Sequence, residues 1–303
     1  MKRIIIWGLK SVSHSHRYIH EGFFDALSRA GYDCLWVDDE PQNNHFVARD
    51  SLIISVNLAS KHLAFRPDAK FVLHNIESER FQGQRNVLNL QVATNRSIGD
   101  SVDDSLAKYD AKTSTIYQPW GIPTAPSTWQ KPNQNPGHTE YWVGSIWNNE
   151  LNQGNTEIIA SYKASLESFD LTFEQANKMK IGWPAKLGGK GLWIPSMISE
   201  SEAAGFVYRS PIGASIVGNW QRENGYIPCR LFKNLAAGQP ATSNADFSSL
   251  LDGACLFSED VDDLIRERLN LSAQEKKHLV EEGQRATLKY TYERGFGRML
   301  ACL

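Results

Sequence analysis

The sequence predicts an α/β fold made of two Rossmann-like domains. Its first apolar run, Ile4–Trp7, has the length and continuity of a strand buried on both faces of a parallel sheet. Further short apolar runs alternate with helical segments, an order typical of βαβ units. A proline-rich stretch at 119–136 interrupts this pattern, and a strand restarts it at Tyr141. We therefore expect a first Rossmann-like domain at 1–130 and a second one at 139–303.

In the first domain, a helix over His20–Ala30 is expected after the first strand, because its apolar residues fall on one side and Gly31 follows it. The remaining strands are expected at Cys34–Val37, Ser51–Val56, Lys70–Leu73, Leu88–Ala93 and Ser114–Tyr117. The polar stretch Gly99–Lys108 has a helical pattern and predicts a solvated surface segment.

In the second domain, the strand Tyr141–Gly144 is followed by a helix over Thr156–Ser168. A short helix lies between Pro228 and Gly238, and a strand-like run follows it at once. The chain then closes with a long helix over about Ser272–Leu300.

Composition and charge exclude several classes of protein. The 303 residues are 41% hydrophobic and 22% charged, as in a globular protein long enough for two cores. A net charge of -2 argues against a nucleic-acid binder, which needs clustered cations. The four cysteines are scattered without a Cys-x-x-Cys pair, which favours a reducing cytoplasm. No apolar run reaches the length of a membrane span or a signal-peptide core, so any membrane contact is expected to be peripheral.

A short helix with two cations near its start is the centre of the second domain. Pro228 suits the first turn, and Gly238 suits the position just past the end of a helix of about three turns. Arg230 and Lys233 are three residues apart and therefore share one face near the positive end of this helix. Because cations and free N–H groups disfavour each other there unless an anion is bound, the pattern predicts a phosphate or diphosphate site. The alternative is that both cations point into solvent on an amphipathic helix.

This helix and the end of the chain resemble a known family. Arg230-Leu-Phe-Lys-Asn-Leu-Ala-Ala-Gly238 is similar to the donor-site helix of GT-B glycosyltransferases of the spore-maturation type, whose pattern is Arg-x-Phe-Glu-x-x-Ala-x-Gly. Gly283-Gln-Arg-Ala-Thr-Leu-Lys-Tyr-Thr-Tyr-Glu-Arg294 resembles the closing Gly-Arg…His-Thr-Tyr-x-x-Arg helix of the same group. The resemblance covers the last third of the chain closely and the first half only in architecture.

Two positions depart from the family pattern. Lys233 stands where the family usually has the Glu that holds the nucleotide ribose, and Tyr290 stands where it has His. The first departure brings the helix closer to the α1,3-fucosyltransferase pattern Glu-Lys-x-x-x-Asn-x-x-x-x-Gly. This sequence matches that pattern in part, at Cys229, Arg230, Asn234 and Gly238.

The resemblance implies a metal-independent glycosyltransferase of GT-B architecture without a cofactor. In this architecture the acceptor-side domain at 1–130 and the nucleotide-sugar donor domain at 139–303 would face each other across a cleft. Such an enzyme moves a sugar from a UDP- or GDP-linked donor to a hydroxyl of a glycan, glycolipid or protein. Its ligands lie at the carboxyl ends of the strands, and its last helix often crosses back to the first domain. Arg230 and Lys233 would then neutralise the leaving diphosphate in place of a divalent ion.

The turn after the first strand carries the candidate catalytic base. His14, His16, His20 and Glu21 cluster where a helix begins at the carboxyl end of this strand. Histidine suits proton transfer near neutral pH, so we predict His16 as the base, with His14 and Glu21 as alternatives. The spacing of His16 and His20 also fits a zinc pair, but spacing places no third ligand, so we predict no metal site.

Further donor-binding candidates follow from position: Asn234, Asn244, Tyr226, Trp220, Arg209 and Ser145. The two asparagines would be neutral hydrogen-bonding neighbours of the cations. Tyr226 or Trp220 could stack on a base or sugar, with buried packing as the alternative. Ser145 belongs to the first turn of the second domain, where N–H groups could approach a phosphate.

Three other motifs do not support a different function. The turn after the first strand lacks the second and third glycines of a dinucleotide-binding fingerprint, which disfavours an oxidoreductase. Asp103-Asp104 has no preceding apolar strand and is interpreted as solvated surface. The glycine-rich stretch Gly182–Gly191 lacks the Gly-Lys-Ser/Thr ending of a triphosphatase loop and predicts a surface loop.

The leading hypothesis is a glycosyltransferase that binds a nucleotide sugar and a carbohydrate-type acceptor. An epimerase or hydrolase of a nucleotide sugar, or a non-catalytic carbohydrate-binding protein, is the alternative. The sequence leaves open the base and sugar of the donor, the acceptor, the stereochemical outcome and the oligomeric state.

Overall fold

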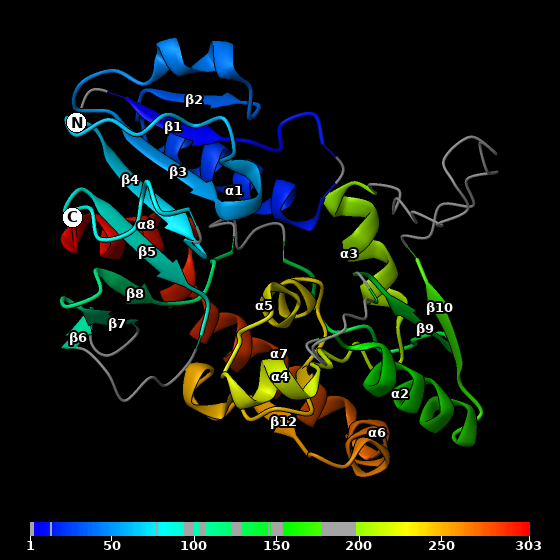
Figure 1. Ribbon diagram of the computed structural model, residues 1–303. Helices are drawn as coiled ribbons and strands as arrows, with labels where there is room; N and C mark the ends of the chain where they lie inside the picture. The colour runs from blue at the N-terminus through cyan, green and yellow to red at the C-terminus, as the bar shows by residue number, and fades with distance from the viewer. Residues whose placement is uncertain are drawn as a thin grey trace.

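The computed structural model describes residues 3–12, 14–76, 78–93, 100–102, 107–122, 129–144, 146, 154–176 and 198–303. Figure 1 shows an N-terminal part built around one large sheet and a C-terminal part in which helices surround two short pairs of strands. Helix α5 (Cys229–Ala236) lies near the middle of this view, on the side of the C-terminal part that meets the large sheet. The predicted α/β fold class is confirmed.

The large sheet has the strand order β2-β1-β3-β4-β5-β8-β7-β6. Its strands are β1 (Ile4–Trp7), β2 (Cys34–Val37), β3 (Leu52–Val56), β4 (Lys70–His74), β5 (Val87–Gln91), β6 (Asp100–Val102), β7 (Ala107–Asp110) and β8 (Thr115–Tyr117). The pairs from β2 to β8 are parallel, and β7 and β6 add an antiparallel edge. A central parallel sheet of this kind places the carboxyl ends of its strands at one common edge.

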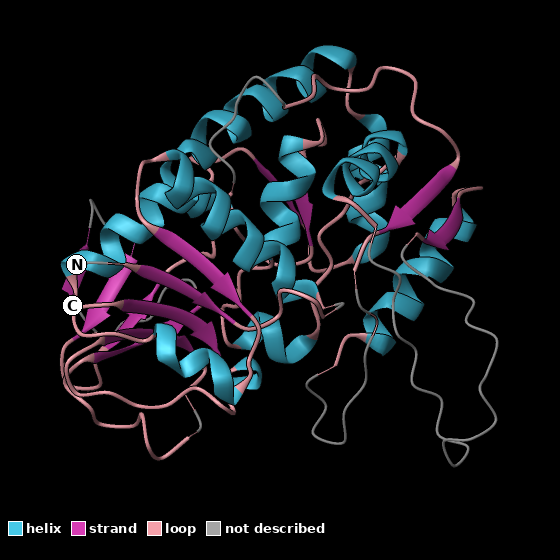
Figure 2. Cartoon of the chain, turned by 90° about the horizontal axis from the view of Figure 1, so that it is seen from above, coloured by secondary structure: helices cyan, strands magenta, loops and turns pink. Residues whose placement is uncertain are grey.

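Both faces of β1 are buried, which explains why its sequence is continuously apolar. Ile4 and Ile6 join one hydrophobic cluster, and Ile5 and Trp7 join a second cluster on the opposite face. The first cluster includes helix α1 (Ser15–Arg29), whereas the second is closed by residues of loops and of the short helix η1 (Pro41–Phe46). In Figure 2, helices accordingly run along one face of this sheet, and mostly loops cover the other.

The C-terminal part pairs β9 (Thr139–Trp142) with β10 (Thr172–Gln175), and β11 (Ala241–Ser243) with β12 (Cys255–Phe257), both in parallel. Its helices are α2 (Thr156–Ser168), α3 (Glu200–Arg209), α4 (Asn219–Glu223), α5, α6 (Val261–Asn270) and α7 (Ala273–Thr287). The extended segment 210–217 is buried and reaches both pairs. The Ser215 N–H bonds the carbonyl of Thr242 in β11, and the Ser210 hydroxyl accepts the Tyr141 N–H of β9.

Glu140 of β9 anchors this segment through its buried carboxylate. The carboxylate accepts the N–H groups of Ile212, Gly213 and Ala214 and the hydroxyl of Tyr162. Burial raises the pKa of Glu140, and these hydrogen bonds oppose that change. The buried Arg268 guanidinium supplies a neighbouring positive charge.

Replacing Glu140 by Gln is expected to destabilise the protein by about 2–4 kcal/mol. The amide would turn an N–H₂ donor toward backbone donors and leave the Arg268 charge without its carboxylate. Urea unfolding at pH 7 measures the loss. Glu167→Gln is the control, because Glu167 is an exposed partner of Lys163 on α2 and its change should cost under about 0.5 kcal/mol. Equal losses in the two variants would contradict the anchoring role.

The sequence predicts one long final helix, and this prediction is wrong. The segment divides into α7, the short helix η5 (Leu288–Tyr290) and α8 (Tyr292–Ala301). The break occurs because Thr291 has extended backbone angles, with φ -67° and ψ 155°, and its side chain caps α8 by accepting the Arg294 N–H.

Helix α8 packs on the N-terminal part, as Figure 1 shows. The Ile122 N–H bonds the Tyr290 carbonyl, and the Tyr292 N–H bonds the Ile122 carbonyl. The Tyr292 ring meets the Phe23 ring of α1 at 4.8 Å and covers Gly22, where a Cβ atom would lie 2.3 Å from it. The end of the chain is therefore built into the core around α1.

The helix expected over Gly99–Lys108 is also wrong. The described residues there form β6 and β7, which pair antiparallel at the sheet edge. Asp103 and Asp104 lie outside the described residues. Strand β7 is partly exposed, with Lys108 and Tyr109 half-buried, so its sequence lacks the apolar run that marks the inner strands.

Candidate functional site

The candidate site lies where the start of α5 meets the carboxyl-end loops of the large sheet. Pro228 is the N-cap of α5, one position earlier than predicted, and Gly238 follows the helix end with φ +81°. Just before this helix, the Ile227 N–H bonds the carbonyl of Val92, which follows β5. The first N–H groups of α5 therefore open toward the edge where the strands of the first sheet end.

Arg230 is held against the end of β9. Its Nε–H donates to the Val143 carbonyl at 3.2 Å, and its guanidinium lies 3.6 Å from the centroid of the Trp142 ring. An added Cβ on Gly144 would lie 2.0 Å from Nη2 of Arg230, so the glycine makes room for the guanidinium. Burial lowers the pKa of Arg230 to about 10, which still leaves it charged at neutral pH.

No carboxylate among the described residues lies within ion-pair distance of Arg230. An aromatic ring and one carbonyl stabilise the cation only in part. A buried cation in this setting gains free energy when an anion binds.

Lys233 points from α5 to the N-terminal part. Its Nζ lies 4.8 Å from the centroid of the Tyr18 ring in α1. The Tyr18 hydroxyl in turn donates to the Ile198 carbonyl, two residues before α3. The two predicted cations thus contact different sides of the site.

His16 lies in the first turn of α1 among other rings. His14 is the N-cap, and its Nδ1 accepts the His16 N–H at 3.1 Å. The His16 Nδ1 is 3.3 Å from the same atom, and we assign the proton of this contact to His16 because Nδ1 of His14 already accepts the backbone N–H. This tautomer leaves Nε2 of His16 with a lone pair. The rings of His74 and Trp120 flank His16 at 5.8 Å and 5.7 Å.

The histidine cluster is neutral at physiological pH. Burial is the main cause that lowers the pKa of His16 to about 3, with the neighbouring histidines adding to it. Burial also lowers the pKa values of His20 and His74 to about 4, and that of His14. His20 and His74 donate their Nδ1–H groups to the carbonyls of Gly8 and Leu90. His16 can therefore accept a proton at neutral pH, although weakly.

Two of the predicted donor-binding residues, Asn244 and Asn234, form hydrogen bonds with the backbone. Asn244 is buried, and its amide bonds both the N–H and the carbonyl of Val217. Asn234 is 3% exposed, donates to the Gly213 carbonyl, and has an Oδ1 without a partner among the described residues. Tyr226 packs against the main core and pairs with Ala93, which favours the packing alternative.

The other predicted residues lie around the site or outside it. Trp220 is the second residue of α4. It is 37% exposed, so its ring is accessible to a ligand. Arg209 stacks on the rings of Tyr141 and Phe206. Glu21 is half-buried in α1. Ser145 and the stretch Gly182–Gly191 lie outside the described residues.

Sequence reasoning missed the residues that support the predicted ones: Trp142, Tyr18, His74 and Trp120. Of these, only His74 had a usable signal, because it ends β4 at the carboxyl edge where ligands of parallel sheets gather. The aromatic partners of the cations are far away in sequence and carry no local pattern.

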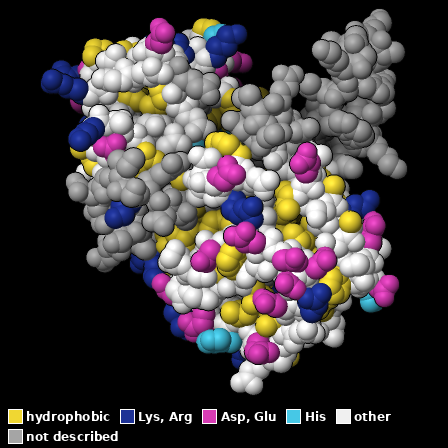
Figure 3. Space-filling view, turned by 60° about the horizontal axis from the view of Figure 1, so that its bottom comes forward, with side chains coloured by type: hydrophobic (Ala, Val, Ile, Leu, Met, Phe, Trp, Pro, Cys, Tyr) yellow, Lys and Arg dark blue, Asp and Glu magenta, His cyan; other side chains and the backbone are white. Residues whose placement is uncertain are grey.

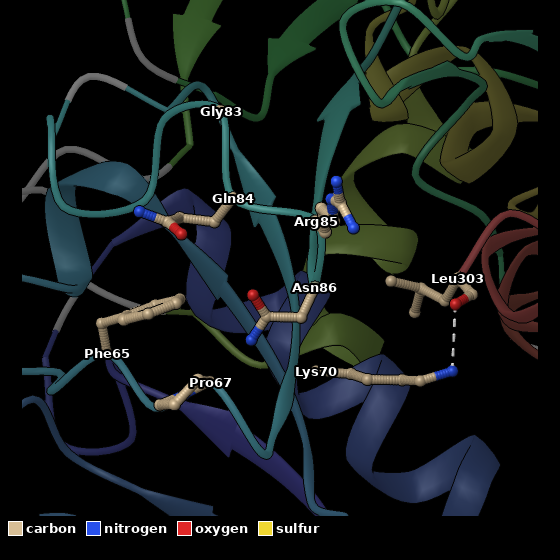
Figure 4. Close-up of a pocket in the computed structure, with 8 residues that line it drawn as sticks. All are labelled: Phe65, Pro67, Lys70, Gly83, Gln84, Arg85, Asn86 and Leu303. Atoms are coloured by element: carbon tan, nitrogen blue, oxygen red, sulfur yellow. Dashed lines mark hydrogen bonds between the residues drawn. The ribbon is translucent and has the colours of Figure 1, made fainter.

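A separate hollow of about 520 Å³ lies at the opposite edge of the sheet. Figure 4 shows its lining, with Lys70 at the start of β4 and Asn86 just before β5. Lys70 donates to the carbonyl of Leu303 at 3.0 Å. This hollow is remote from α5 and from the histidine cluster, and we do not assign the chemistry to it.

Among the described residues, no three His, Cys, Asp or Glu side chains are arranged to hold a metal ion, and no helix has the length and apolar character needed to cross a bilayer. On the face in Figure 3, acidic side chains are spread among basic ones over the C-terminal part.

Comparisons with known proteins show the fold. No protein-family model matches the chain, and no curated protein matches it. An alpha-glucosyltransferase solved with UDP and a 13-mer DNA containing a HMU base aligns with a TM-score of 0.60 and 11% identity, covering 98% of this chain and 99% of that one. The trehalose 6-phosphate synthase of Burkholderia multivorans aligns with a TM-score of 0.53 and 10% identity, covering 99% and 95%. The N-terminal domain of Candida albicans trehalose-6-phosphate phosphatase aligns with a TM-score of 0.50 and 9% identity, covering 100% and 97%.

At these identities the similarity shows the fold alone. The chain has a GT-B-like fold over its full length, and this fold resembles that of nucleotide-sugar glycosyltransferases.

Proposed function

We propose that this protein is a glycosyltransferase that moves a sugar from a nucleoside diphosphate donor to a hydroxyl of a glycan, glycolipid or protein. The observation that carries the proposal is the Arg230 guanidinium, which is buried at the start of α5 without a carboxylate partner among the described residues. The GT-B-like fold and the UDP bound by one structural neighbour support a nucleotide as the anion.

The proposed chemistry divides the site into two sides. On the donor side, Arg230, Lys233 and the first N–H groups of α5 stabilise the negative charge that develops on the leaving diphosphate. On the acceptor side, Nε2 of His16 takes the proton of the acceptor hydroxyl. The acceptor oxygen then bonds to the anomeric carbon, and the electron pair of the broken bond to phosphate stays on the diphosphate.

A thermal-shift panel with UDP, GDP, CMP and their sugars tests the proposal. A ligand present at 100 times its Kd stabilises the protein by roughly 2.7 kcal/mol, which is readily measured. We expect a nucleoside diphosphate to stabilise the full chain and a matching nucleotide sugar to be consumed only with an acceptor. Donor turnover without an acceptor would instead identify an epimerase or hydrolase, and sugar binding without any nucleotide shift would identify a carbohydrate-binding protein.

A further inference from the structure

We propose that Tyr18 is a positioning residue that fixes the His16 side of the site relative to the cation side on α5. This inference rests on the proposed function and names the contact that joins its two halves. The Tyr18 ring lies 4.8 Å from Lys233 Nζ, and its hydroxyl bonds the Ile198 carbonyl. One side chain of α1 thus contacts both α5 and the segment that leads into α3.

The helical geometry of α1 lets its first turns contact both the large sheet and α5. Residues two apart on a helix do not face each other, so Tyr18 and His16 project in different directions from one rigid turn. His16 meets His74 and Trp120 at the carboxyl ends of the large sheet, whereas Tyr18 meets Lys233. One turn of α1 therefore links the rings around His16 to the Lys233 ammonium.

The neutral ring of Tyr18 is suited to holding the Lys233 side chain in one orientation. It attracts the ammonium through its quadrupole and restricts the rotamers of a long side chain. Tyr18 can thus orient Lys233 before an anion arrives.

The first test uses amide hydrogen exchange of the ligand-free full chain and does not depend on the proposed activity. Tyr18→Leu removes both contacts and is expected to speed exchange in the first turn of α5 and at the start of α3 by roughly two- to fivefold. Tyr18→Phe keeps the ring and should speed exchange only near Ile198. Tyr32→Leu is the matched control, because Tyr32 is 42% exposed and its ring lies on Phe296, away from α5. Unchanged exchange of the α5 turn in Tyr18→Leu would overturn the bridge.

The second test separates positioning from binding. Once the panel has identified the donor, Tyr18→Leu should lower kcat about tenfold or more while the Kd of the nucleoside diphosphate, UDP or GDP, changes much less. Tyr18→Phe should restore most of the lost kcat, because it returns the ring. Parallel losses in kcat and affinity, or no rescue by Phe, would contradict the positioning role. If no nucleotide binds the wild-type chain, the proposed function fails, and the exchange test still decides whether the bridge exists.

Discussion

Replacing His16 by Gln is expected to lower kcat by about 10²- to 10⁴-fold while the Kd of the donor diphosphate stays unchanged. Glutamine keeps a polar side chain of similar reach but cannot take up the acceptor proton. Steady-state kinetics with the donor found by the ligand panel, together with calorimetry of the diphosphate, measures both quantities. His45→Gln is the control, because His45 lies in η1 and is exposed. Wild-type kcat in His16→Gln would refute the assignment and favour His14 or Glu21.

The pH profile of kcat/KM gives a second check, since it reports the free enzyme. Burial lowers the pKa of His16 to about 3, so its ring stays unprotonated between pH 8 and pH 5. Burial lowers the pKa values of the neighbouring His20 and His74 to about 4, so these two rings add no positive charge in this range, and burial also lowers the pKa of His14. We therefore expect no loss of kcat/KM from protonation of His16 down to pH 5. An ordinary histidine base, with a pKa of about 6.5, would cause a roughly 30-fold fall at pH 5.

Replacing Gly144 by Ala is expected to weaken diphosphate binding by about 10- to 100-fold, although the glycine itself carries no charge. The new Cβ atom would lie 2.0 Å from Nη2 and 3.1 Å from Cζ of Arg230. Because these atoms end a flexible side chain, the guanidinium should leave its place over Trp142, and the φ of +157° at Gly144 adds backbone strain that lowers stability. Calorimetry with UDP or GDP measures the loss of affinity, and urea unfolding measures the loss of stability.

Gly137→Ala is the matched control on the other side of β9. There, an added Cβ would meet nothing closer than the Arg209 carbonyl at 3.6 Å, so binding should not change. A double-mutant cycle with Arg230→Met makes the test sharper. If Gly144 acts through Arg230, adding Gly144→Ala to Arg230→Met should cause no further loss. Additive losses would show that the two residues act separately.

Local sequence signals predicted α5 and the inner strands well. Pro228 and Gly238 lie at the two ends of α5 because the conformational preferences of proline and glycine act within a few residues. The strands β1 and β2 were predicted at their observed bounds, since continuous apolar runs mark burial on both faces.

The failures occurred where the deciding interaction is not local. The edge strands β6 and β7 have a polar sequence, and it is pairing with β8 that makes them strands. The break before α8 depends on Thr291, whose cap is one of many that a threonine in a helical pattern could make. Periodicity alone does not distinguish such a cap from a helix interior.

Predictions of the site are also limited to what local sequence signals can show. Helix ends and a histidine cluster led to the prediction of Arg230, Lys233 and His16 as site residues. The sequence could not reveal that Arg230 reaches Val143, because 87 residues separate the two. It also could not reveal that the amide of Asn244, a predicted donor ligand, bonds the backbone of Val217.

The attachment of α8 to α1 has a consequence for any attempt to divide this protein. Residues 291–303 follow the C-terminal part in the chain but fill the core of the N-terminal part, through Tyr292, Phe296 and Met299. A single cut near residue 125 would leave the first piece without its final helix and the second piece with an exposed apolar tail. Two polypeptide connections therefore join the parts, one after Ile122 and the other at Thr291.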